Sequence, residues 1–161
     1  FGLLLYMIVE KKKAGATIEE AAAYAEEIRL SICHWFTVDD LVYLKRGGRV
    51  SATTAFVGNA LGIKPVMHVD NEGHLINVSK VRGRKASIDA LAKKVGETGI
   101  PGANDTIFIC HGDCIADAEY LAKRMKEELG VPEVIIGYTG PVIAAHSGPG
   151  TLALFFVGKS R

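Results

Sequence analysis

The sequence predicts a two-layer α/β domain, with a six-stranded mixed sheet and helices packed on it. Six short segments rich in β-branched and aromatic residues alternate irregularly with five or six helical segments, and that order is typical of a mixed sheet. The chain has 161 residues, of which 48% are hydrophobic, so it is long enough to bury one core. Neither a low-complexity linker nor an internal repeat divides it.

The first residues are predicted to be helical. Residues 3–13 are apolar and then basic, like the C-terminal half of a helix. Thr17 and Glu20 form a capping box, T-x-x-E, that opens a second helix reaching about Leu30. The chain lacks an initiator Met, so we expect a fragment: residues 1–32 as a helical connection from a missing N-terminal domain, and residues 33–161 as the α/β domain.

The next segments are predicted from their caps and turns. Residues 33–38 form a strand, after which Asp39 or Asp40 caps a short helix, LVYLKR, that stops at Gly47-Gly48. Ser51 caps a further helix over 52–61. Strands 63–69 and 74–81 form an antiparallel hairpin around a turn at 70–73.

The second half is predicted to alternate between helices and strands. A helix over about 85–95 precedes a loop containing Gly96, Gly99, Pro101 and Gly102. Residues 106–110 are a continuous apolar run and read as a buried strand. The remaining expected elements are a helix at 115–129, a strand at 133–138, a short turn or single helical turn at 141–145, a tight loop at 146–150 and a strand at 151–157.

The charges are strongly polarised along the chain. Residues 41–88 hold eight basic and two acidic side chains, a net charge of +6, whereas the rest of the chain carries −5. The bases are grouped in two Gly-containing runs, KRGGR and VRGRK. Turn amides and Arg side chains suit phosphate or carboxylate groups, so the runs are either plain surface turns or a site for an anion or an acidic partner.

Several familiar motifs are absent or unconvincing. The sequence has no phosphate loop, H-E-x-x-H or G-x-S-x-G motif, and no apolar run of membrane-spanning length. Cys110-His111-Gly112-Asp113-Cys114 contains metal-ligand atom types, but a core Cys ending a strand is the better interpretation. Three cysteines are too few for a disulfide scaffold and indicate a reducing cytoplasm. No cofactor is predicted.

Two features leave a structural and a functional interpretation open. His146, in AAHSGPG, is either a structural hydrogen-bond donor or part of a network around a carboxylate or hydroxyl, to which Ser147 and loop amides add donors. The apolar stripe that includes Phe56, Ala60, Ile63 and Met67 is either core or the wall of a lipid tunnel.

Four segments together resemble the DegV family of fatty-acid-binding proteins: FTVDDLVYLKRGGRVS, GIKPVMHVDNEGHLINVSKVRGRKAS, HGD and GPVIAAHSGPGTLALFF. The resemblance implies the second, six-stranded domain of a two-domain protein that holds a long-chain fatty acid in a tunnel between its domains. It also implies a non-catalytic role: the acid is presented to a separate fatty-acid kinase, and the acyl-phosphate enters phospholipid synthesis.

The resemblance further implies roles for individual residues. His146 and Ser147 belong to the network at the acid's carboxyl group, and Arg49, Arg82 and Arg84 lie near the head group or face the kinase. Residues 52–67, including Phe56, Ala60, Ile63 and Met67, line the acyl chain. The family's hydroxyl ligands lie in the N-terminal domain, so the fragment alone is expected to bind poorly and to self-associate.

Two other classes of function compete with lipid binding. An enzyme or binder of phosphorylated or acidic small molecules would use the Arg and Lys side chains to bind the anion. However, no nucleophile–base pair can be recognised in the sequence. Nucleic-acid binding is disfavoured because only 7% of residues are aromatic and the basic runs contain no aromatic residues for stacking.

Overall fold

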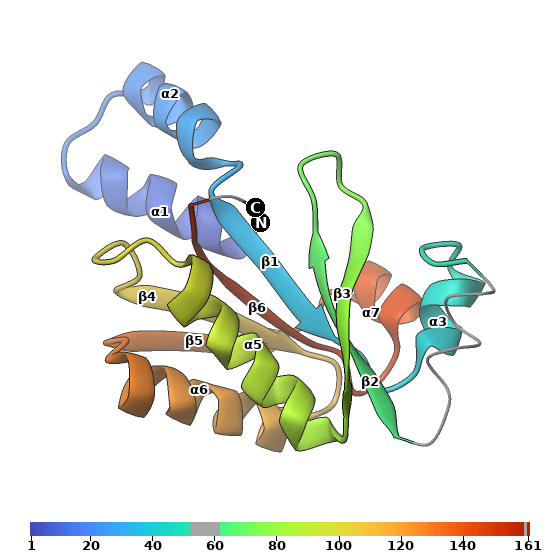
Figure 1. Ribbon diagram of the computed structural model, residues 1–161. Helices are drawn as coiled ribbons and strands as arrows, with labels where there is room; N and C mark the ends of the chain where they lie inside the picture. Colours follow the sequence, from blue (N-terminus) through green and yellow to red (C-terminus); the bar gives the residue numbers. More distant parts are fainter. Residues whose placement is uncertain (52–61, 160) are drawn as a thin grey trace.

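Six strands form one mixed sheet in a computed structural model of the chain, which describes residues 1–51, 62–159 and 161 (Figure 1). The strand order is β3-β2-β1-β6-β4-β5, and the pairs are antiparallel except for the parallel pair β4–β5. The predicted fold class is therefore confirmed. The strands are β1 Ile32–Thr37, β2 Ile63–Val69, β3 Leu75–Arg82, β4 Thr106–His111, β5 Glu133–Tyr138 and β6 Leu152–Val157.

Helices α5 (Arg84–Thr98) and α6 (Ile115–Leu129) cover one face of the sheet (Figure 1). Alternate residues of β1, β4 and β6 point into the main core beneath them, including Trp35, Ile109 and Leu154. Leu91 of α5 and Leu121 of α6 are fully buried in the same cluster. This alternation is expected of strands that have one face against a helix layer.

The other face carries two smaller apolar clusters. Leu3 of α1 (Gly2–Lys13) packs with Ile32 and Val157 in one of them. Leu41 of α3 (Leu41–Arg46) packs with Phe36 and Met67 in the other. The remaining described helices are α2 (Ile18–Ile28), which packs on α1, and α7 (Pro141–Ser147), which packs on α3.

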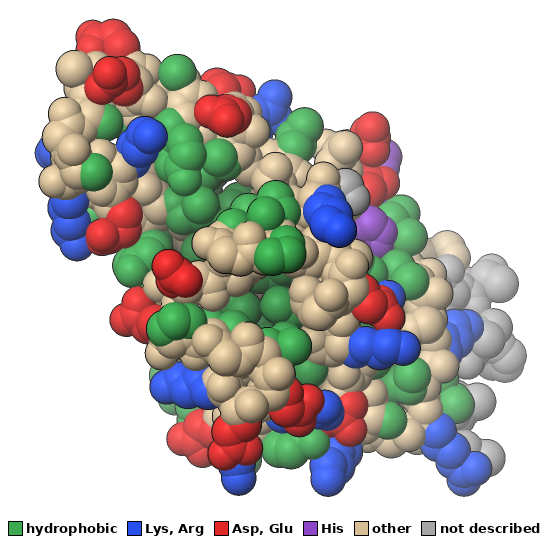
Figure 2. All heavy atoms as spheres, turned by 60° about the vertical axis from the view of Figure 1, so that its left-hand side comes forward, with side chains coloured by type: hydrophobic (Ala, Val, Ile, Leu, Met, Phe, Trp, Pro, Cys, Tyr) green, Lys and Arg blue, Asp and Glu red, His purple; other side chains and the backbone are tan. Residues whose placement is uncertain are grey.

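A half-buried strip, here called the open strip, extends across this second face from one small cluster to the other. Strand pairing places His34, Phe155 and Phe108 in one row and Ala153 and Cys110 in the next. Figure 2 shows hydrophobic side chains gathered where the α1–α2 hairpin meets the body of the molecule. Exposed apolar residues of this hairpin are Phe1, Leu5, Val9 and Ile18.

Local signals in the sequence set several element ends. The Thr17 capping box is present: the Thr17 hydroxyl accepts from the Glu20 amide at 3.2 Å, and the Glu20 carboxylate accepts from the Thr17 amide at 2.8 Å. Of the two candidate caps for α3, Asp40 takes the role, because its Oδ1 accepts from the Val42 amide at 2.8 Å.

Some predicted boundaries were wrong. Helix α5 continues to Thr98 and includes Gly96, which was assigned to a loop. Helix α7 is longer than a single turn and includes His146 and Ser147, which were assigned to the following loop. The helix predicted over 52–61 lies outside the described residues, and the boundary proposed between residues 32 and 33 stays a prediction. No described helix has the length and hydropathy needed to cross a bilayer.

Candidate functional site

The motifs quoted from the sequence converge at one end of the sheet, here called the motif end. It is the end at which β1, β3, β4 and β5 finish and β2 and β6 begin. KRGGR spans the end of α3, GIKP opens β2, VRGRK ends β3 and opens α5, HGD begins with the last residue of β4, and HSGPG leads from the end of α7 toward β6. Strand pairing thus brings together segments that are far apart in the sequence: Arg49 and His146, for example, are separated by 97 residues.

His146 and Ser147 occupy the last turn of α7, where backbone carbonyls already bind them. Nδ1 of His146 lies 2.7 Å from the Val142 carbonyl oxygen, and the hydroxyl of the buried Ser147 donates to the Ile143 carbonyl at 2.8 Å. Because a carbonyl oxygen only accepts, Nδ1 of His146 carries the proton. The neutral ring therefore offers Nε2 as an acceptor, and Nε2 becomes a donor only when the ring is protonated.

Glycine allows α3 and α7 to approach closely. A Cβ atom on Gly47, which ends α3, would lie 2.5 Å from Cδ2 of His146, and one on Gly148, which ends α7 with φ 80°, would collide with the ring of Tyr43. Nη1 of Arg49 donates to the Gly47 carbonyl at 2.6 Å. His146 and Arg49, predicted separately, therefore both contact Gly47.

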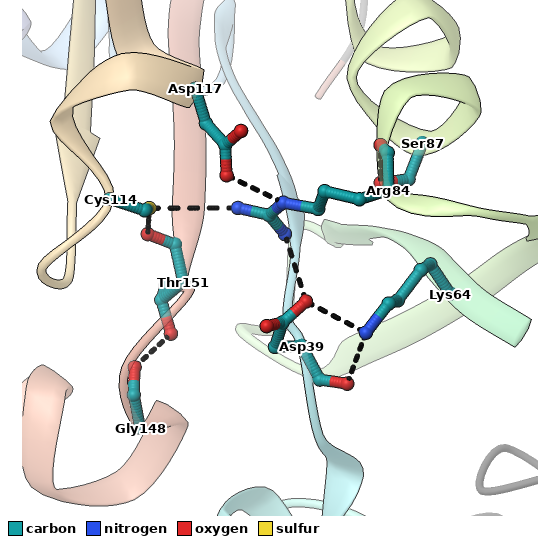
Figure 3. Close-up of polar contacts among 8 residues, drawn as sticks. All are labelled: Asp39, Lys64, Arg84, Ser87, Cys114, Asp117, Gly148 and Thr151. Atoms are coloured by element: carbon teal, nitrogen blue, oxygen red, sulfur yellow. Dashed lines mark hydrogen bonds and ion pairs between the residues drawn. The ribbon is translucent and has the colours of Figure 1, made fainter. Parts of the chain in front are cut away.

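Arg84, the first residue of α5, lies within a network of internal partners (Figure 3). Its Nε donates to Asp117 Oδ2 at 2.8 Å, its Nη2 donates to Cys114 Sγ at 3.5 Å, and its Nη1 lies 3.9 Å from Asp39 Oδ1. Lys64 Nζ binds Asp39 through both Oδ1, at 2.7 Å, and the backbone carbonyl, at 2.9 Å. The guanidinium thus faces protein groups on all sides, and its side chain is 20% exposed.

Cys114 connects Arg84 to the Gly-rich loop before β6. Burial raises the pKa of the Cys114 thiol, so the neutral S–H donates to the Thr151 carbonyl at 3.3 Å. The hydroxyl of the buried Thr151 in turn donates to the carbonyl of Gly148 at 2.7 Å (Figure 3). A chain of polar contacts therefore leads from α5 to the end of α7.

The other predicted site residues lie in different environments. Arg49 and Arg82 are exposed, as predicted for residues in exposed basic turns. Ile63 is half-buried opposite Arg82, whereas Met67 is fully buried in the cluster beneath α3. Phe56 and Ala60 lie outside the described residues. The roles proposed for these side chains stay predictions.

The structure divides the basic segment into two kinds of cation. Lys64 and Arg84 are largely buried and bound to carboxylates, as described above. Among the described residues of the basic segment 41–88, the exposed cations that have no carboxylate partner are Lys45, Arg46, Arg49, Lys80, Arg82 and Lys85. Sequence reasoning missed the buried group because its carboxylates, Asp39 and Asp117, lie outside the basic segment.

The ligand atoms of the Cys110–Cys114 segment do not converge. His111 is buried at the end of β4, where its Nδ1 accepts from the Cys114 amide at 3.2 Å. Cys110 points toward the opposite face of the sheet and accepts from the Thr139 hydroxyl at 3.5 Å. Among the residues that the structure describes, the group with metal-ligand atoms within 4.8 Å of one another is Asp70, Glu72 and His74, in the β2–β3 turn.

The residues that form the open strip are uncharged at neutral pH, and a cation lies beside them: Nη2 of Arg161 is 3.2 Å from Nδ1 of His34. His34 is its one titratable ring, and it packs edge-on against Phe155 with the ring centroids 5.4 Å apart. Burial, assisted by the nearby Arg161 guanidinium, lowers the pKa of His34 to about 4. The strip therefore presents aromatic and small apolar groups, and its Ala153–Cys110 end lies toward the motif end.

Comparison with known proteins agrees with this arrangement. The family model described as "Uncharacterised protein, DegV family" matches residues 1–159. The chain is 44% identical over 160 residues to a DegV domain-containing protein of Clostridium perfringens, covering 99% of this chain and 55% of that protein. It is 38% identical over 146 residues to a fatty acid-binding protein of Thermotoga maritima, covering 89% of this chain and 50% of that protein.

A solved structure gives the same result for the fold. The crystal structure of a DegV lipid-binding protein from Thermotoga maritima is similar with a TM-score of 0.81 at 34% identity, over 99% of this chain and 55% of that chain. The chain spans about half the length of the curated relatives it matches. By the extent of these matches, the chain belongs to the DegV family.

Proposed function

We propose that this chain belongs to a fatty-acid-binding protein and forms one wall of the site for a long-chain fatty acid. The observation that carries the proposal is the open strip, a half-buried, uncharged surface that leads toward the motif end, where His146 and Arg49 meet at Gly47. The name of the 38% identical Thermotoga maritima relative supports the same class of ligand.

The strip suits an acyl chain because its residues are apolar and incompletely covered. Burying hydrocarbon stabilises a complex by ~0.8 kcal/mol per CH₂ group, so a long tail supplies most of the binding energy. A second wall, contributed by an N-terminal domain of the full-length protein, would cover the other side of the tail. The exposed apolar side chains of the α1–α2 hairpin are suitable contacts for such a domain.

The carboxyl group would lie at the motif end, near His146 and Arg49. A buried carboxylate is costly unless donors or cations surround it. Nε2 of His146 accepts a hydrogen bond from a protonated acid or, once the ring is protonated, donates one to a carboxylate. The exposed Arg49 adds only a positive charge that water screens. Hydroxyl groups of the N-terminal domain would complete the network.

The partner proposed for the bound acid is a separate fatty-acid kinase that phosphorylates the carboxyl group. Six exposed cations near the motif end, including Arg49 and Arg82, have no described carboxylate partner, so they suit an acidic protein surface. In this proposal the chain binds and presents the acid, and the phosphoryl transfer takes place on the kinase. The protein would act in the cytoplasm and supply phospholipid synthesis.

Narrowing the open strip tests the site of the acyl chain. Ala153→Leu adds bulk to the strip, whereas Ala116→Leu adds the same bulk to the exposed surface of α6 and serves as the control. We expect Ala153→Leu to weaken the binding of oleate by about tenfold, the equivalent of ~1.4 kcal/mol, and Ala116→Leu to leave it unchanged. Equal oleate affinity of both variants, with unchanged thermal stability, would contradict the placement.

Extraction of the purified full-length protein tests the class of ligand. Mass spectrometry of the organic extract should reveal a long-chain fatty acid. A phosphate-containing small molecule in its place would favour the competing function, an enzyme or binder of phosphorylated compounds.

A further inference from the structure

We propose that Arg84 is a positioning residue that fixes the end of α7, and with it the ring of His146, without contacting the fatty acid. This rests on the proposed function, because the effect on ligand is measured through fatty-acid affinity. It distinguishes Arg84 from Arg49 and Arg82, which carry the same charge but are exposed.

The first reason is that protein groups either bind or bury every nitrogen of the Arg84 guanidinium, so a ligand cannot reach a pair of its N–H donors. A carboxylate ligand usually binds Arg through two parallel N–H donors. In this chain Nε is bound to Asp117 and Nη2 to Cys114. Nη1 makes no hydrogen bond, but it is buried and lies 3.9 Å from Asp39 Oδ1. A ligand carboxylate would have to displace at least one of these protein groups.

The second reason is a polar route from Arg84 to α7. The Sγ atom of Cys114 receives an N–H from Arg84 and donates its own proton to the Thr151 carbonyl. Thr151 Oγ1 donates to the carbonyl of Gly148, the residue that ends α7 two positions after His146. Thr151 is 3% exposed, so water cannot replace this hydrogen bond at the loop.

A second route passes through Asp39. A Cβ atom on Gly150 would lie 2.7 Å from Cβ of Asp39, so the loop backbone lies directly against this residue. Lys64 binds both the carboxylate and the carbonyl of Asp39 and holds it in place beside Arg84. Arg84 therefore supports the loop before β6 from two sides (Figure 3).

Arg124 provides a matched control. Like Arg84, it links α5 to α6: its guanidinium binds Asp89 of α5 and Glu128 of α6. Its side chain is 23% exposed, close to the 20% of Arg84. Among the described residues, Arg124 makes no hydrogen bond or ion pair with Cys114, Thr151 or the loop before β6, so replacing it removes comparable ion pairs without touching the proposed routes.

The experiment compares Arg84→Met and Arg124→Met in the full-length protein, each with His146 intact and with His146→Ala. With His146 intact, we expect Arg84→Met to weaken oleate binding by about tenfold, whereas Arg124→Met changes it by less than about twofold. In the His146→Ala background, Arg84→Met should change the affinity for oleate by less than about twofold, because the effect of Arg84 on binding passes through His146. Equal losses in both backgrounds, or no loss with His146 intact, would overturn the proposal.

A second measurement does not depend on fatty acid. In ligand-free protein, the NMR signals of the His146 ring should shift in Arg84→Met and stay unchanged in Arg124→Met. If the wild type binds no fatty acid, the proposed function fails, and the ring signals still decide on the positioning role. Unchanged ring signals in Arg84→Met would overturn it.

A milder pair of variants covers the case in which Arg84→Met does not fold. Thr151→Val removes the hydroxyl that binds the Gly148 carbonyl, and Thr151→Ser retains it. We expect Thr151→Val to shift the His146 ring signals and Thr151→Ser to restore them. Identical signals in both variants would contradict the route through Thr151.

Discussion

The two faces of the sheet differ in how completely they are covered. Leu154 and Phe155 are neighbours on β6, yet Leu154 is fully buried under α5 and α6 while Phe155 is half-buried on the opposite face. The first face belongs to a close-packed core, in which the loss of even one methyl group lowers the free energy of unfolding. The second contains two small clusters with the open strip between them. One face therefore stabilises the domain, and the other is available for a ligand or a second domain.

The largest expected effect comes from removing the proposed second wall, which should weaken ligand binding on the second face while leaving the core on the first face intact. Residues 1–161 alone should fold, because the core under α5 and α6 is complete, but should bind palmitate about three to four decades more weakly than the full-length protein. A tail that is half exposed to water forfeits on the order of 5 kcal/mol at ~0.8 kcal/mol per CH₂. Calorimetric titration measures this, and sedimentation should detect self-association through the uncovered face. Tight one-to-one binding of palmitate by residues 1–161 would be inconsistent with a site that needs a second wall from another domain.

The next prediction compares the two neighbours on β6. Leu154→Ala should lower the free energy of unfolding by ~3 kcal/mol, because it leaves a cavity in the core. Phe155→Ala should cost less than about half of that amount and should instead weaken oleate binding. Urea denaturation and a fluorescent fatty-acid displacement assay measure both quantities. If Leu154→Ala and Phe155→Ala lowered the free energy of unfolding equally, the two faces of the sheet would contribute equally to stability.

A pH titration sharpens the comparison at His34. The folded-state pKa of about 4 lies below the ordinary value of 6.5, so the unfolded chain takes up the proton first as the pH falls. The stability from the neutral ring is therefore present above pH 6.5 and is lost as the pH falls toward 4, by about 2 kcal/mol between pH 7.5 and 5. His34→Phe should flatten the decline. Parallel pH profiles of the wild type and variant would show that His34 is not responsible.

The smallest effect concerns the exposed cations at the motif end. Arg49→Ala and Arg82→Ala should change fatty-acid affinity by less than about 1 kcal/mol, because exposed charges are screened by water and salt. They should lower the rate of phosphorylation by the kinase, with an effect that shrinks at high salt. Lys126→Ala, an exposed cation on α6, is the control. Collapse of lipid affinity with an unchanged phosphorylation rate would exclude the partner-facing role.

The parts of the fold that depend on neighbouring residues could be predicted from the sequence. The capping box of Thr17 and Glu20 needs only a four-residue segment, and the β2–β3 hairpin is set by its own turn. Helix α7 was underestimated because Gly140 and Gly148 enclose just seven residues, and the last two, His146 and Ser147, directly precede the Gly-Pro-Gly of the following loop. The choice of Asp40 over Asp39 as the cap follows from the pairing of Asp39 with Lys64, which lies 25 residues away.

The candidate site could be predicted only in part, for a similar reason. Arg49 and Arg84 look equivalent in sequence, since each belongs to a Gly-containing basic run. Their difference comes from Asp117, 33 residues beyond Arg84, which the packing of α6 against α5 brings to 2.8 Å. No local pattern reports that distance. The sequence motifs therefore named the segments that strand pairing brings to the motif end, but they could not separate exposed cations from buried ones.

The position of β6 has a consequence for how the chain folds. It is the last of these six strands in the sequence, yet it lies between β1 and β4, and Trp35 pairs with Leu154, 119 residues further along the chain. Until β6 arrives, the β1–β3 meander and the β4–β5 pair have no strand to join them. Such non-local pairing slows folding and leaves strand edges unpaired in the meantime. Nascent or truncated chains that lack β6 should therefore aggregate through β1 and β4. The insertion of β6 between these two strands is the step that commits the domain to its native sheet.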